Sequence, residues 1–193
     1  MTAAPEVEDR ELVARSLAGD QRAFSLLLAR YKEPVYRLIR RYVGSSDDAY
    51  DLLQQTFVSA WTSLGRYDRA RPFAAWVRTI ALNKCRDWSR RSAVRRLFVT
   101  PPRKDEVLEA APDPQRGAEA GMVANEDEDE LARELARLPA GLKEPLLLTV
   151  LEGLSQAEAG EVLGLSAKAV ESRVYRARKV LADRLGRRPR SPS

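Results

Sequence analysis

Apolar residues recur at intervals of three and four along most of this chain, which is the spacing of one face of an α-helix. No stretch alternates apolar and polar residues convincingly in the manner of a strand. Gly19 and Gly44 are placed to end helices, and Ser46 with the acidic residues after it to start one. Pro72 suits a first turn, whereas Pro34 should kink or divide its helix. Four helices are therefore predicted in the N-terminal half, at residues 9–17, 21–43, 47–64 and 73–96.

The helical pattern stops over residues 98–125, where prolines, glycines and acidic residues dominate. Such a composition cannot bury enough apolar surface to offset chain entropy, so a flexible linker is predicted. Periodicity resumes near Asp129, and the chain ends in a short basic segment rich in proline and serine. The predicted fold class is all-α, with two small helical domains joined by a flexible acidic linker. Its parts are residues 9–96, 97–128, 129–185 and the tail 186–193.

Charge falls into three blocks that the net charge of +5 conceals. Residues 66–96 carry ten basic and two acidic side chains, residues 105–130 carry one and ten, and residues 166–193 carry nine and two. Two basic blocks, each within an amphipathic helix, indicate a polyanionic partner such as nucleic acid. A solvated basic surface is the alternative for either block alone.

The chain contains no histidine and a single cysteine, Cys85. Histidine-dependent catalysis, zinc clusters and disulfides are therefore excluded, and the sequence holds no phosphate-binding loop. We expect a protein that is not an enzyme, with no cofactor, no metal and no small-molecule substrate. The N-terminus lacks the pattern of a signal peptide, and no apolar run could span a bilayer. A cytoplasmic protein without membrane insertion is predicted.

The C-terminal half carries the signals of a helix-turn-helix. Ser155 and Glu158 have the spacing of a capping box, in which each side chain bonds the other residue's free backbone amide. Gly164 is placed to end that helix in a left-handed turn, and Ser166 to cap the next. Two helices around a tight glycine turn are thereby predicted.

The second of these helices has two faces. Its apolar stripe consists of Val170, Val174, Ala177, Leu181 and Leu185. Its opposite face presents Lys168, Ser172, Arg176 and Lys179, with Arg173 at the edge. These side chains can bond base edges and phosphates in a major groove. An ordinary amphipathic helix with a basic surface is the alternative.

The helix predicted at 47–64 also has two faces. A core stripe is formed by Leu53, Phe57, Ala60 and Leu64, with Trp61 alongside. The other face carries Asp51, Gln54, Gln55, Val58 and Thr62. A carboxylate, amides and an exposed valine indicate a partner-binding patch more than a solvated face, which is the alternative.

The helix predicted after Pro72 should bury Phe73, Val77, Ile80, Ala81 and Trp88 while Arg78, Asn83, Arg86 and Arg90 project elsewhere. The loop before it, residues 65–71, mixes Tyr67 with arginines. Such a mixture suits single strands, because arginines follow the backbone while an aromatic ring stacks on an unpaired base. Tyr67 could equally pack against its own domain.

Three segments, in order, resemble sigma factors of the extracytoplasmic-function (ECF) type. Residues 48–61 resemble the family's polymerase-binding helix, and residues 72–90 its −10 reader. Residues 138–178, with Glu152-Gly153-Leu154-Ser155 and Arg176-Ala177-Arg178, are similar to its −35 reader. The resemblance covers residues 9–96 and 129–185, and it implies a region 2 bundle and a region 4 helix-turn-helix.

The resemblance implies binding to core RNA polymerase (β′ clamp and β subunit), to promoter DNA and to an anti-sigma factor, with a role in a stress response. The residues implied for polymerase docking are Asp48, Asp51, Gln54, Gln55 and Val58. Those implied for −10 recognition and melting are Tyr67, Arg71, Arg78, Asn83, Arg86 and Arg90. Those implied for −35 recognition are Lys168, Ser172, Arg173, Arg176 and Lys179.

Some residues depart from the family pattern. Tyr50 and Gln55 stand where acidic residues are usual, Glu171 where a basic one is common, and Ala159-Gly160 replaces a bulkier pair. The glycine either costs helix stability or permits closer packing. The linker either threads the polymerase cleft or is solvated. Three other functions compete: a one-component helix-turn-helix regulator without polymerase docking, a nuclease, and a mimic that titrates an anti-sigma factor.

Overall fold

Four helices build the N-terminal half in the computed structural model, which describes residues 8–99, 131 and 133–186. They are α1 (Asp9–Leu17), α2 (Gln21–Val43), α3 (Ser46–Ser63) and α4 (Phe73–Val99), and a 3-10 turn at Leu64–Arg66 follows α3. The predicted bounds of the first two helices are confirmed. α4 extends through Leu97, Phe98 and Val99, which had been placed in the linker. The remaining linker residues up to 128 and the tail at 187–193 lie outside the described residues.

Local capping explains where these helices begin and end. The Asp20 side chain accepts hydrogen bonds from the amides of Arg22 and Ala23, which starts α2. Gly44 ends α2 with a φ of 82°, a left-handed conformation that glycine adopts without strain. The N-cap of α3 is Ser45, whose hydroxyl accepts from the Asp48 amide at 3.3 Å, so the prediction of Ser46 was wrong by one residue.

Pro34 lies inside α2 without dividing it. A proline in a helix interior costs roughly 3 kcal/mol because it removes one backbone hydrogen bond and crowds the preceding turn. Leu27, Val35 and Leu38 on either side are fully buried, and their packing offsets that cost. Tertiary burial therefore overrides the local break signal.

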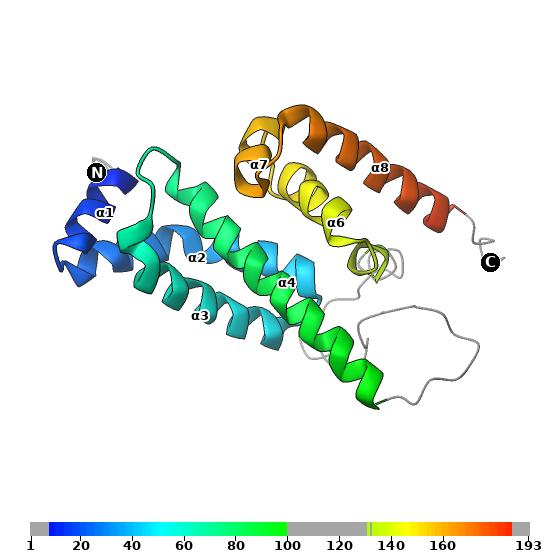
Figure 1. The fold of residues 1–193 in the computed structure, drawn as a ribbon, viewed down its shortest axis with the longest axis horizontal. Coiled ribbons are helices and arrows are strands. Elements are labelled where there is room, and N and C mark those ends of the chain that lie inside the picture. Colours follow the sequence, from blue (N-terminus) through cyan, green and yellow to red (C-terminus); the bar gives the residue numbers. More distant parts are fainter. Residues whose placement is uncertain (1–7, 100–130, 132, 187–193) are drawn as a thin grey trace, which may run out of the picture.

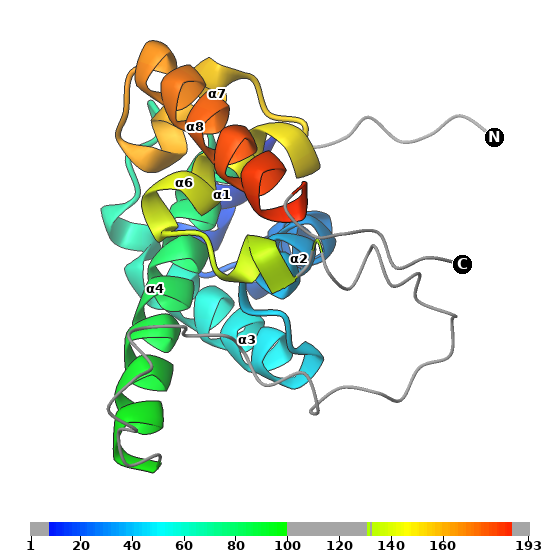
Figure 2. The same ribbon diagram turned by 90° about the vertical axis from the view of Figure 1, so that its right-hand side faces the viewer.

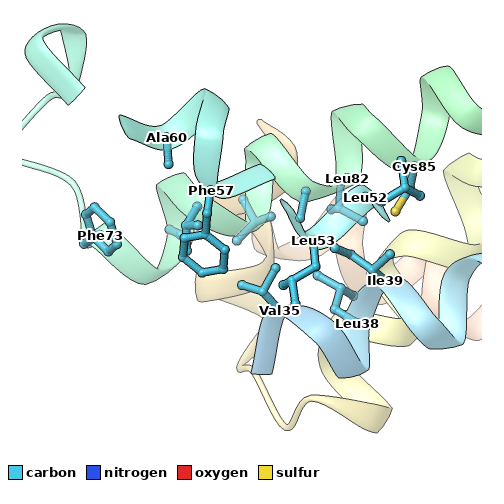
Figure 3. Close-up of a cluster of buried hydrophobic side chains, with 14 of the residues drawn as sticks. Val35, Leu38, Ile39, Leu52, Leu53, Phe57, Ala60, Phe73, Leu82 and Cys85 are labelled. Atoms are coloured by element: carbon cyan, nitrogen blue, oxygen red, sulfur yellow. The ribbon is translucent and has the colours of Figure 1, made fainter. Parts of the chain in front are cut away.

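The core of this half lies where α2, α3 and α4 meet (Figure 3). Val35, Leu38 and Ile39 of α2 point toward Leu52, Leu53 and Phe57 of α3, while Leu82 and Cys85 close the cluster from α4, as Figure 3 shows. The apolar stripe predicted for the third helix is confirmed for Leu53, Phe57, Ala60 and Leu64. Trp61 is 41% exposed and meets Phe24 edge-on, with 4.8 Å between ring centroids.

The C-terminal half contains α6 (Ala140–Leu146), a π-helical turn η2 (Leu147–Leu151), α7 (Gln156–Leu163) and α8 (Ala167–Leu185). The predicted capping box is confirmed: the Ser155 amide donates to the Glu158 carboxylate at 2.8 Å, and the Glu158 amide to Ser155 Oγ at 3.2 Å. Gly164 ends α7 with a φ of 68°, and Ser166 caps α8. The helix-turn-helix is thus present as predicted.

Gly160 permits the close packing of this turn. A Cβ atom on it would lie 2.5 Å from the backbone carbonyl oxygen of Leu165, a distance that real Cβ contacts essentially never reach. Of the two interpretations left open by the sequence, closer packing is therefore the one observed.

The two halves pack against each other. α7 contacts α4, and η2 contacts α2, as Figures 1 and 2 show with α6, α7 and α8 lying over α2 and α4. Leu147, Leu148 and Val162 belong to the same buried cluster as the N-terminal core. The sequence had indicated two domains held together only by a linker, so this shared core is an unexpected finding.

Replacing Gly160 by alanine should lower stability, although alanine favours helices by up to about 1 kcal/mol over glycine. Overpacking typically costs about 1–3 kcal/mol, because the Leu165 carbonyl belongs to the backbone and cannot rotate away. Thermal unfolding followed by circular dichroism would measure the loss. Gly65→Ala is the matched control, since a Cβ there meets nothing within 4 Å. Equal melting temperatures for the two variants would contradict the packing explanation.

Candidate nucleic-acid interface

The outward face of α8 is basic and, among the residues that the structure describes, largely exposed. Lys168, Ser172, Arg176 and Lys179 are exposed, and Arg173 is half-buried at the edge. On the opposite side Val170, Ala177 and Leu181 are buried, with Val174 and Leu185 partly so. The predicted division of the helix into two faces is therefore confirmed.

Tyr175 belongs to the same exposed surface, with 69% of its area accessible. Sequence reasoning did not single it out, although its place three residues after Ser172 on a helix was a usable signal. A tyrosine offers both an apolar ring and a hydroxyl, so it can contact either a base or a sugar.

Contacts at both ends fix α8 in place. At its N-terminus the Ala169 amide donates to Ser166 Oγ at 3.2 Å. Toward its C-terminus Arg184 lies 3.3 Å from the Glu134 carboxylate, and Ala177 and Leu181 pack against Leu138 and Leu146. The basic face is thus presented by a rigid helix rather than by a loop.

The four side chains predicted to project from α4 are in different surroundings. Asn83 and Arg90 are exposed, and the Arg90 guanidinium pairs with Asp87 one turn away. Arg78 is half-buried, and its Nε atom is buried without a hydrogen-bond partner among the described residues. Arg86 is bound by Glu144 of α6, with its Nε atom 2.7 Å from Oε1.

The hydrogen bonds that Arg86 donates to the Glu144 carboxylate raise the pKa of Arg86 above its ordinary value. The remaining guanidinium nitrogen, Nη1, donates to Asn83 Oδ1 at 2.9 Å. Arg86 is therefore engaged with protein groups in this structure, whereas the sequence had indicated only that it leaves the core.

The loop before α4 has a buried aromatic and exposed arginines. Tyr67 is 8% exposed and packs on Trp76 and Phe73, with centroids 4.9 and 5.7 Å away. Its hydroxyl donates to the Arg71 carbonyl. Of the two alternatives for Tyr67, packing against its own domain is the one observed. Arg66 and Arg69 remain exposed.

The exposed face of α3 is mainly polar. Asp51, Gln54, Gln55 and Val58 are all exposed, and Val58 has 63% of its area accessible. Asp48 differs because it is half-buried and accepts a hydrogen bond from Trp88 Nε1 at 3.0 Å, which ties α3 to α4. Tyr50, one of the departures from the family pattern, is half-exposed and stacks near Tyr36 at 4.6 Å between centroids.

The described residues also bear on whether the chain has a metal site, a reactive thiol or a membrane-spanning helix. The described residues hold no group of three or more histidine, cysteine, aspartate or glutamate side chains that could bind a metal ion. Cys85 is fully buried, and burial raises the pKa of its thiol. Within the ranges that the structure describes, no helix is both long and apolar enough to cross a bilayer.

Two family models match the chain: Sigma-70 region 2 over residues 27–95, and Sigma-70, region 4 over residues 128–181. The RNA polymerase sigma factor CnrH of Cupriavidus metallidurans is 40% identical over 92% of this chain and 94% of its own length. The ECF RNA polymerase sigma-E factor of Haemophilus influenzae is 31% identical over 94% of this chain and 97% of its own.

Solved structures agree with these matches. CnrH in complex with the cytosolic domain of CnrY superposes with a TM-score of 0.68 at 36% identity, covering 92% of this chain and 97% of that one. RpoE of Bartonella quintana in complex with the anti-sigma factor NepR has the same fold, with a TM-score of 0.63 at 23% identity over 86% and 98% of the two chains. The chain therefore belongs to the ECF-type RNA polymerase sigma factors, which direct promoter-specific initiation of transcription.

Proposed function

We propose that three separate faces divide the work of initiation in this chain. The exposed face of α3 docks on core polymerase, α4 with its preceding loop contacts the −10 element, and α8 contacts the −35 element. The observation that carries this proposal is the chemical contrast between the faces. Those of α4 and α8 are rich in arginine and lysine, whereas the exposed face of α3 has neither and combines carboxylates with amides and Val58.

The −35 assignment rests on the geometry of the helix-turn-helix. In this motif the N-terminal part of the second helix enters the major groove, and its outward side chains reach base edges. Lys168, Ser172, Arg173 and Arg176 occupy the first half of α8 and suit that role, while Lys179 lies further along the same face. Tyr175 joins this proposed contact surface.

The −10 assignment rests on the basic groups of α4 and the loop before it. Asn83, Arg90 and Arg71 are exposed, although Arg71 also donates to the Glu161 carbonyl. Arg78 and Arg86 are half-buried, so the C-terminal half would have to move before DNA could reach them fully. The burial of Tyr67 supports a scaffolding role, in which it holds the arginine-rich loop without stacking on a base itself.

Docking on polymerase is assigned to Asp51, Gln54, Gln55 and Val58 on α3, with the β′ clamp as the partner surface. Asp48 supports this face by fixing α3 against α4 through Trp88. The β subunit is the proposed partner of the C-terminal half. With Tyr50 and Gln55 in place of acidic residues, hydrogen bonds and apolar contact would contribute more to docking than charge.

An anti-sigma factor is a further proposed partner. The solved structure of CnrH is a complex with the cytosolic domain of CnrY, and this chain matches CnrH over nearly its whole length.

A one-component regulator without polymerase docking is not favoured, because known sigma factors match both halves of the chain together. A protein of this kind would act in the cytoplasm and catalyse no reaction itself.

Single substitutions should separate −35 recognition from docking. Arg176→Ala should weaken binding to the −35 element by about 1–3 kcal/mol, roughly 5- to 150-fold, and leave core binding intact. Arg178→Ala, a basic exposed neighbour outside the proposed face, is its control and should have the smaller effect. Gel-shift titration of holoenzyme and pull-down on core polymerase would measure the two properties.

Asp51→Arg should instead weaken core binding first, because it reverses an exposed carboxylate beside Gln54 and Gln55 on the docking face. Asp183→Arg makes the same charge change at an exposed position near the end of α8 and should leave core affinity unchanged. If Asp51→Arg and Arg176→Ala impaired the same step, the proposed division of labour would be wrong.

Tyr67→Leu tests whether the aromatic ring packs or stacks. Leucine keeps apolar volume beside Trp76 but removes the aromatic face. The affinity for single-stranded −10 DNA should therefore change by less than twofold, while the melting temperature of the protein falls. Base stacking on an aromatic is worth about 1–3 kcal/mol, so a stacking role would lower the affinity about fivefold or more. Asn83→Ala serves as the positive control for a lost DNA contact in fluorescence anisotropy.

A further inference from the structure

The contact between the two halves covers part of the surface that α4 would offer to DNA. α7 lies against α4, and η2 lies against α2. Both views of the fold show this arrangement, with α6 and α7 placed over α2 and α4 (Figures 1 and 2). The face of α8 proposed to contact DNA points away from the contact and stays exposed.

The best-defined polar contact joins Arg86 of α4 to Glu144 of α6. Two guanidinium nitrogens of Arg86 donate to the two carboxylate oxygens, with Nε at 2.7 Å from Oε1. Glu144 is 3% exposed, so this pair is largely shielded from water. A paired fork of this kind is also how arginine holds a phosphate group. The carboxylate therefore takes up the paired donors that Arg86 could otherwise offer to a phosphate group.

Acceptors on α7 and just after η2 engage three further side chains of the N-terminal half. Arg71 donates to the carbonyl of Glu161 at 2.7 Å, and Thr79 donates to the carbonyl of Val162 at 3.0 Å. Arg41 bonds the Glu152 carboxylate at 2.9 Å, and the Glu152 side chain is almost fully buried. Arg71 of the proposed −10 surface and Arg41 of α2 are thus both bound by oxygens of the C-terminal half.

Apolar burial adds to these polar bonds. Leu147, Leu148 and Val162 are buried within the N-terminal cluster. The Lys143 ammonium lies 4.8 Å from the centroid of the Tyr42 ring, and burial lowers the pKa of this lysine to about 8. Separating the halves would expose these side chains to water, so the contact has an apolar component as well as a specific polar one.

We propose that this contact is an autoinhibitory latch, in which Glu144 takes the place of a −10 DNA phosphate on Arg86 and keeps the free chain closed. Closure and −10 binding are then mutually exclusive, because both use the Arg86 guanidinium. The −35 face is outside the latch and stays accessible. Core polymerase opens the latch by holding the two halves apart. The inference rests on the proposed −10 role of α4.

Closure is tested first without DNA, by small-angle X-ray scattering of the free full-length chain. Arg86→Glu places two carboxylates together and should increase the radius of gyration. Arg90→Glu makes the same change one turn along α4 at an exposed position and should leave it unchanged. The double variant Arg86→Glu/Glu144→Arg restores an opposite-charge pair and should return to the compact size. An equal radius for all three variants and the unaltered chain would overturn the latch.

DNA binding provides the second readout. Glu144→Arg should raise the affinity of the free chain for a fluorescein-labelled single strand from the −10 region of a promoter used by the holoenzyme. The expected gain is about tenfold, since apparent affinity scales with the fraction of molecules that are open. Asp183→Arg carries the same charge change at an exposed site near the end of α8, outside the contact between the halves, and is the control. Equal gains for both would show general electrostatic attraction and overturn the latch.

Circular dichroism would verify that each variant keeps its helical content. Arg86 is half-buried whereas Glu144 is buried, so charge reversal at Arg86 is less disruptive to folding than charge reversal at Glu144. The two readouts also separate two kinds of failure. If scattering shows opening but opened variants bind the −10 strand no better, the −10 assignment of α4 is wrong while closure through Arg86 stands.

Discussion

The packing of α2 against α3 and α4 is the interaction on which the rest of the molecule depends. Leu38 and Ile39 of α2, Leu52 and Phe57 of α3 and Leu82 of α4 fill one interior, and it is strong enough to hold α2 continuous through Pro34. Because these stripes face inward, the outward faces of α3 and α4 are fixed in direction. The polar face of α3 and the basic face of α4 are positioned by a shared core rather than by each other.

Features governed by neighbouring residues were predictable from the sequence. The bounds of α1 and α2, the capping box at Ser155 and the two faces of α8 all follow from spacing and local hydrogen bonding, and the structure has them. The N-cap of α3 was misplaced by one residue because Ser45 and Ser46 are equally suitable by composition, and only backbone geometry distinguishes them.

Features that depend on distant residues were not predictable. Nothing near Glu144 in the sequence indicates that it would bind Arg86, which is 58 residues away in the chain. The burial of Tyr67 depends on Trp76 and Phe73 folding back over it, so local pattern left packing and stacking equally open. Gly160 indicated either a weakened helix or close packing, but the Leu165 carbonyl that leaves no room for a side chain is apparent only in three dimensions.

The proposed division of labour thus depends on surfaces that one helical scaffold keeps chemically distinct. The surface proposed for the −10 element is partly covered while the two halves are packed together. The most direct measurement is transcription by core RNA polymerase reconstituted with the full-length chain on a promoter whose −35 and −10 elements can be altered independently. We expect one defined transcription start site that requires both elements. Failure to bind core, or a start that survives the loss of either element, would contradict that expectation.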